Sequence, residues 1–309
     1  MQWRMPVFMG LLIATNALLP FCFGFKIWDW NLGASSNENI RITSPELLTP
    51  ENRHRKNNST RIVIYNRIGK SGSTTIMKAL EHSGCDFYLA ARSFQRRLTA
   101  YEFNGIHNFI TQSNASCQVI VGHFGYAKQL RGENTNYMNI MRDPLERWKS
   151  LYYFWEANCV QGYKIWCKKG HYGSMAQRLL TYSTANDCLK EAIQQNVSML
   201  KHCTMALDST QIDYLHPGYQ GHGCARIVKT ILNRYKLIGT IEQCYHSGNL
   251  IRNIILPAFP PSNFCGNVAN QGHGVHAALD RKVEVALRGE LSCDFRLMNA
   301  VQQRYMKEN

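Results

Sequence analysis

The sequence predicts an α/β protein in which a central, mostly parallel sheet carries helices on both faces. Short apolar runs of strand length recur along the chain. Stretches with helical spacing separate these runs, and turns containing glycine or charged residues follow them. Strands that alternate with helices are typical of parallel sheets, because each crossover helix covers one face.

The first strand and helix lie in Arg61–Gly84, RIVIYNRIGKSGSTTIMKALEHSG. Ile62 to Tyr65 is a run rich in β-branched residues, and Gly69 and Gly72 bracket the turn that follows. Ser73 or Thr74 can cap the next helix, and Gly84 stands where a C-cap glycine would.

Further strands and helices follow in alternation. The expected strands are Cys117–Gly122, Tyr137–Met141 and Lys236–Thr240. Asp143 and Pro144 suit the N-cap and first position of a helix that runs through Arg147, Leu151 and Phe154. Other helical patterns cover Leu98–Gln112, Cys224–Tyr235, Gly248–Leu256 and Asp280–Met306.

Three expected strands end at residues that can bind an anion or accept a proton. These residues are Arg67 to Lys70, His123 and Arg142. Ligands of parallel sheets bind beyond the carboxyl ends of the strands. A helix N-terminus beside Lys70 forms a cradle for phosphate or sulfate. Ile64 occupies the position of the first Walker A glycine, which disfavours a nucleoside triphosphatase loop.

Each of these signals also has a purely structural alternative. The loop could be an ordinary glycine-rich turn. His123 could be a structural hydrogen-bond donor after a buried strand. Arg142 and Asp143 could be a helix-capping pair with a local ion pair. The convergence of all three at one sheet edge favours a functional site.

The N-terminal part predicts entry into the secretory pathway. Residues 1–5 form a short cytoplasmic tail, and 6–25 an uncharged signal-anchor segment long enough to span a bilayer. A cleaved signal peptide, cut near Cys22 or Gly24, is the alternative. Residues 26–60 have the polar composition of a lumenal stem, and 61–309 form one folded domain.

Sequons and cysteines agree with a lumenal location. Asn57, Asn58, Asn114 and Asn196 each open a glycosylation sequon. Eleven cysteines leave ten beyond the apolar segment, an even number that suits disulfides. Cys159/Cys167 and Cys188/Cys203 are the close pairs, although sequence alone leaves the connectivity open. No two cysteines form a CxxC pair, which argues against zinc.

The formal net charge of +14 predicts a polyanionic partner. Nucleic acid, acidic lipid and acidic polysaccharide all satisfy this charge. The secretory compartment favours an acidic polysaccharide over nucleic acid.

Two motifs resemble the Golgi polysaccharide 2-O-sulfotransferases, which act on heparan, dermatan and chondroitin sulfate. YNRIGKSGSTT, Tyr65–Thr75, resembles the family's 5′-phosphosulfate loop, in the form found in the uronyl 2-sulfotransferase branch. IMRDPLERWKSLYYF, Ile140–Phe154, resembles its 3′-phosphate motif. Weaker similarity runs from about Arg61 to Pro260. The resemblance implies a P-loop-like sulfotransferase fold for 61–309 and a Golgi type II membrane protein.

The resemblance also implies roles for individual residues. His123 falls on the catalytic histidine, Lys70 on the lysine at the bridging oxygen, and Arg67 on a position facing the acidic glycan. Cys188 and Cys203 match a bridged pair. The residues implied to bind the donor 3′-phosphoadenosine 5′-phosphosulfate are Lys70, Ser71, Gly72, Ser73, Thr74, Thr75, Arg142 and Ser150.

Sulfuryl transfer needs orientation, removal of the hydroxyl proton and charge stabilisation on the leaving phosphate, and it requires no metal. Val121 stands where the heparan enzymes have a second histidine. The family forms trimers, which implies a homo-oligomer, although this chain ends several residues before the family's C-terminal segment. Two other functions remain as alternatives. One is a glycan-binding protein of the same fold without catalysis, and the other is a nucleotide-dependent kinase, which would need magnesium carboxylates.

Overall fold

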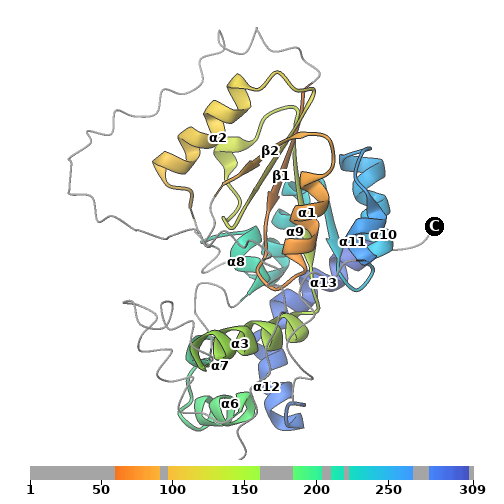
Figure 1. Cartoon of the computed structure of the whole chain (residues 1–309). Coiled ribbons are helices and arrows are strands. Elements are labelled where there is room, and N and C mark those ends of the chain that lie inside the picture. Colours follow the sequence, from red (N-terminus) through yellow and green to blue (C-terminus); the bar gives the residue numbers. More distant parts are fainter. Residues whose placement is uncertain are drawn as a thin grey trace, which may run out of the picture. The chain divides into compact units, whose positions relative to one another are not determined.

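The computed structural model describes residues 60–90, 97–160, 184–203, 210–218, 223–266 and 278–305 (Figure 1). All of them belong to one compact unit, His54–Asn309. The expected tail, anchor segment and nearly all of the stem lie outside the described residues. Within the described ranges, no helix has the length and apolar character needed to cross a membrane.

A five-stranded, entirely parallel sheet forms the centre of this unit and confirms the predicted fold class (Figure 1). The strand order is β2-β3-β1-β4-β5. The strands are β1 (Arg61–Asn66), β2 (Asp86–Leu89), β3 (Cys117–Gly122), β4 (Thr135–Met141) and β5 (Leu237–Thr240).

The register of β1 and β3 brings two predicted site residues together. Asn66, the last residue of β1, pairs with Gly122, the last residue of β3. Arg67 and His123 therefore leave the sheet side by side. The Arg67 N–H donates to the Gly122 carbonyl at 2.7 Å, which holds the two strand ends together.

Separate apolar cores cover the two faces of the sheet. Alternate strand residues such as Ile64 and Ile120 pack on one face, and Val63 and Val119 pack on the other. The first face is covered by α2 (Ala100–Gln112), α8 (Gln211–Leu215), α9 (Cys224–Arg234) and α13 (Ser292–Tyr305). The second is covered by α1 (Ser73–Glu81), α10 (Cys244–Leu250), the π-helix η4 (Ile251–Ile255) and α11 (Pro261–Gly266).

A third core lies between four helices that form a cluster of their own. Trp148 and Tyr152 are fully buried there. Its helices are α3 (Pro144–Val160), α6 (Ala185–Gln194), α7 (Met199–Cys203) and α12 (Arg281–Glu290), which lie together in Figure 1. A 3₁₀ turn, η2 (Lys128–Leu130), precedes β4.

Among the described residues, four disulfides tie these elements together. Cys188–Cys203 confirms one of the two expected pairs and joins α6 to α7. The expected Cys159–Cys167 pair lies outside the residues whose side chains are described. The other bridges are Cys85–Cys117, Cys224–Cys293 and Cys244–Cys265.

Three local expectations differ from the structure. The N-cap of α1 is Gly72, in a left-handed conformation with φ 69°, so the predicted cap at Ser73 or Thr74 is wrong. The helix expected at Gly248–Leu256 starts earlier, at Cys244, and continues as the π-turn η4. The helical stretch from Asp280 breaks at Leu291 into α12 and α13.

Candidate active site

The loop between β1 and α1 has an unusual backbone. Lys70 and Gly72 both have positive φ, 66° and 69°. A side chain at Gly72 would be strained, and its Cβ would lie 2.7 Å from the Ile241 side chain. Ser71 is fully buried, and its Oγ has no hydrogen-bond partner within the described residues. The loop leads into the N-terminus of α1, where the free N–H groups and helix dipole favour an anion.

Arg67 packs against the first turn of α1. Its guanidinium lies 3.4 Å from the Ser73 hydroxyl, 3.3 Å from the Thr74 hydroxyl and 3.2 Å from the Met77 sulfur. Its Nε is buried and unpaired within the described part of the chain. Burial is the main cause that lowers the Arg67 pKa. No carboxylate in the described ranges lies within ion-pair distance of this cation.

His123 is held in one orientation by the neighbouring strand end. Its Nδ1 lies 3.1 Å from the Arg67 carbonyl oxygen. A carbonyl can only accept, so Nδ1 carries the proton and Nε2 keeps a free lone pair. Burial, and next the Arg67 charge, lower the pKa of His123 to about 4. The ring is therefore neutral at neutral and mildly acidic pH.

Lys70 and Arg142 are brought together by the loop. The Arg142 guanidinium donates to the Lys70 carbonyl at 3.3 Å. The Lys70 ammonium lies 4.4 Å from the ring centre of Phe154, in a cation–π contact. Burial, followed by the Arg142 charge, lowers the Lys70 pKa. Two cations this close, with no described carboxylate within ion-pair distance of either, favour the binding of an anion.

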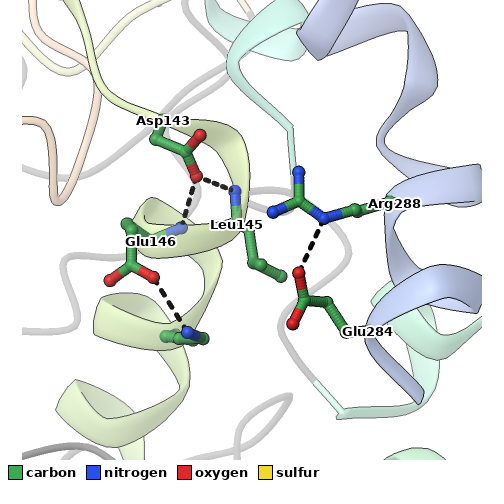
Figure 2. A network of polar contacts seen from close by, with 6 residues as sticks. Asp143, Leu145, Glu146, Glu284 and Arg288 are labelled. Atoms are coloured by element: carbon green, nitrogen blue, oxygen red, sulfur yellow. Dashed lines mark hydrogen bonds and ion pairs between the residues drawn. The ribbon is translucent and has the colours of Figure 1, made fainter. Parts of the chain in front are cut away.

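The start of α3 follows Arg142 directly. The Asp143 carboxylate accepts the N–H groups of Leu145 and Glu146, both at 3.0 Å, as Figure 2 shows. This confirms Asp143 as the cap and Pro144 as the first helical residue. The capping part of the structural alternative is thus confirmed, whereas no ion pair joins Arg142 to Asp143 among the described residues. The Arg142 guanidinium donates to the loop instead. Ser150 lies two turns into α3 and is half-buried.

Sequence reasoning missed three residues that support this site. Arg147 of α3 is 1% exposed and donates from Nε to the Gly69 carbonyl at 2.9 Å. The Gln211 side chain of α8 bonds to both the backbone N–H and the backbone carbonyl of Arg142. Asp294 of α13 accepts N–H groups of α8. Only Arg147 could have been noticed in the sequence, because it places a charged side chain on the apolar face of a predicted helix.

The structure thus gathers the predicted residues in two groups. Arg67, His123, Ser73 and Thr74 form one, and Lys70 and Arg142 form the other, with the loop joining them. Within the described ranges, no three His, Cys, Asp or Glu side chains are arranged as metal ligands.

No protein-family model matches the chain. The chain is 28% identical over 203 residues to the heparan sulfate 2-O-sulfotransferase hst-2 of Caenorhabditis elegans. The match covers 60% of this chain and 57% of that protein, so it spans less than two thirds of the relative's length. This similarity, together with the parallel α/β fold, confirms the resemblance of the chain to the polysaccharide 2-O-sulfotransferases.

Proposed function

We propose that the protein transfers a sulfuryl group from 3′-phosphoadenosine 5′-phosphosulfate to a glycosaminoglycan such as heparan, dermatan or chondroitin sulfate. The acceptor group is the 2-hydroxyl of a uronic acid. One observation carries this proposal most directly: Arg67, Lys70 and Arg142 surround a helix N-terminus with no described carboxylate within ion-pair distance of any of them, and a neutral histidine lies beside them.

The donor is held through its phosphates. Lys70 and the loop from Ser71 to Thr75, including the Gly72 backbone, take the 5′-phosphosulfate at the positive end of α1. Arg142 and Ser150 take the 3′-phosphate. Lys70 leaves the Phe154 ring to reach the donor, which is a small movement for a long side chain.

His123 acts on the acceptor. Its Nε2 takes the proton of the hydroxyl as the hydroxyl oxygen bonds to sulfur. The bond between sulfur and the bridging phosphate oxygen breaks, and 3′-phosphoadenosine 5′-phosphate leaves. Lys70 and the α1 N-terminus stabilise the charge that develops on this phosphate. Arg67, next to His123, binds an acidic group of the acceptor.

The structure and sequence also support a lumenal location in the Golgi. Asn114 and Asn196 are exposed, so both sequons are accessible for glycosylation, and the four disulfides within the described part of the chain suit an oxidising compartment. Asn57 and Asn58 lie outside the described residues. We propose that residues 6–25 anchor the protein in the Golgi membrane and that the protein forms a homo-oligomer.

The test is a transfer assay with a panel of acceptors. The protein is incubated with sulfur-labelled donor and with desulfated heparan, dermatan and chondroitin chains, and the products are analysed as disaccharides. We expect label on the 2-hydroxyl of uronic acid residues of at least one acceptor. Lys70→Ala serves as the inactive control. Chains that bind but never gain label would favour a glycan-binding protein without catalysis, and transfer of phosphate from a nucleoside triphosphate would favour a kinase.

A further inference from the structure

A buried carboxylate in the C-terminal helix is linked to the candidate site through the short helix α8. Asp294 lies in the first turn of α13 and is 2% exposed. Its Oδ1 accepts the N–H of Gln211 at 2.8 Å and that of Ile212 at 3.2 Å. These are the first N–H groups of α8, which have no partner within the helix. Asp294 therefore fixes the N-terminus of α8.

Helix α8 in turn fixes the backbone of Arg142. The Gln211 side chain, 1% exposed, accepts the Arg142 N–H at 3.0 Å and donates to the Arg142 carbonyl at 2.8 Å. This amide therefore bonds to both backbone polar groups of one residue, as a residue of a neighbouring antiparallel strand would. The Arg142 guanidinium then reaches the Lys70 carbonyl. One chain of hydrogen bonds thus runs from Asp294 to the donor loop.

A second connection runs through Arg147 and Tyr214. The Tyr214 ring of α8 lies 5.6 Å from the Arg147 guanidinium, and Arg147 donates to the Gly69 carbonyl at 2.9 Å. The Arg147 charge acts on Asp294 and lowers its pKa, although burial, the larger effect, leaves the value raised to about 7. Asp213 of α8 also acts on this carboxyl and raises its pKa. Asp294 thus interacts electrostatically with a buried arginine that holds the loop.

We propose that Asp294 is a positioning residue for the donor nucleotide. It holds α8 in place, and α8 holds Arg142 and the loop at Gly69 and Lys70 in the geometry that binds the two phosphate groups. This proposal rests on the proposed function of the site. It adds that recognition of the donor depends on a residue of α13, more than 150 positions after Arg142.

The test compares Asp294→Ala with a matched control in the same helix. Val301→Ala also truncates a fully buried side chain of α13, but the Val301 side chain is apolar and takes no part in these hydrogen bonds. The affinity for 3′-phosphoadenosine 5′-phosphate is measured by calorimetry, with thermal unfolding of each variant alongside. We expect Asp294→Ala to weaken binding about 10- to 100-fold, because displacement of Arg142 would weaken its charge-assisted contact with the phosphate, and the loss of such a contact costs about this much.

The control should lower the unfolding temperature but keep the nucleotide affinity within about twofold of the intact protein. Asp294→Asn keeps an oxygen that can accept the α8 N–H groups, so it should recover part of the affinity. If Asp294→Ala binds like the intact protein, or if Val301→Ala loses as much, the residue has only a structural role and the proposal is wrong.

A second variant and a second measurement keep the test independent of folding and of the nucleotide. Gln211→Met breaks the same chain without touching Asp294 and should weaken binding in the same way. If Asp294→Ala does not fold, Gln211→Met with unchanged affinity overturns the proposal.

Hydrogen exchange without nucleotide should be faster at the amides of Arg142 and Ile212 in Asp294→Ala but not in Val301→Ala. If the intact protein binds no nucleotide, the proposed function fails, while unchanged exchange at these amides would refute the role of Asp294 by itself.

Discussion

The pH dependence of the reaction follows from the surroundings of His123. Only the neutral ring can accept a proton, and an ordinary histidine has a pKa of about 6.5. Burial and the Arg67 charge lower the pKa of His123 to about 4. At pH 5.5 about 97% of the rings would be neutral, compared with about 9% for an ordinary histidine. At pH 5.5 the fraction of active protein should therefore be roughly ten times that of a protein whose base is an ordinary histidine.

The assay is kcat/KM for the acceptor between pH 4 and 8, because this parameter reports the free enzyme. Rates should fall only as the pH approaches 4. Arg67→Gln removes one positive charge beside the ring and should move the acidic limb to higher pH. The limb should stay below 6.5, since burial, the larger cause, remains. The ring of His123 can be titrated directly by NMR as an independent check. An acidic limb near 6.5 in the intact protein, unmoved by Arg67→Gln, would refute this reasoning.

Two further predictions concern donor and acceptor binding. Arg142→Ala and Ser150→Ala should weaken binding of 3′-phosphoadenosine 5′-phosphate while turnover at saturation changes little, because the 3′-phosphate does not react. Loss of the charged Arg142 contact should cost about 1.5–3 kcal/mol by calorimetry, and unchanged affinity in both variants would remove them from the site. Acceptor binding should weaken steeply with salt, since exposed charges are screened over about 8–10 Å at physiological ionic strength. If the affinity for heparan or dermatan chains were equal at low and high salt, the prediction that positive charges of the protein bind an acidic glycan would be wrong.

The strands that carry the site were predictable because they are buried on both faces. β1 and β3 contain continuous apolar runs, which is what a central parallel strand requires. β2 was missed because Asp86–Leu89 is a four-residue edge strand without a fully buried position, so it carries little hydrophobic signal.

The residues at the strand ends were predictable for the same reason. Once the strands are known, Arg67, His123 and Arg142 must lie at one sheet edge. The cap of α1 was mispredicted because Ser73 and Thr74 have the side chains of good caps. In the structure both hydroxyls face the Arg67 guanidinium, and the positive φ of Gly72 makes the turn.

The supporting residues could not be predicted from the sequence. Gln211 and Asp294 act through tertiary hydrogen bonds to residues 69 and 83 positions away, and no local pattern marks such bonds. Arg147 was visible as a charge on an apolar helix face. Its target, the carbonyl of Gly69, became apparent only with the fold.

The central claim is that His123 takes the acceptor proton while Lys70 and Arg142 hold the donor. Single-turnover transfer from a preformed complex of protein and donor tests it directly, because the donor is already bound when the acceptor is added. His123→Ala should bind the donor with unchanged affinity and transfer sulfate about 10²–10⁴ times more slowly, the usual contribution of a positioned base. The loss should lie toward the larger value, because Val121 provides no second imidazole two residues earlier. A variant that transfers at nearly the intact rate would show that another group takes the proton and would contradict the account.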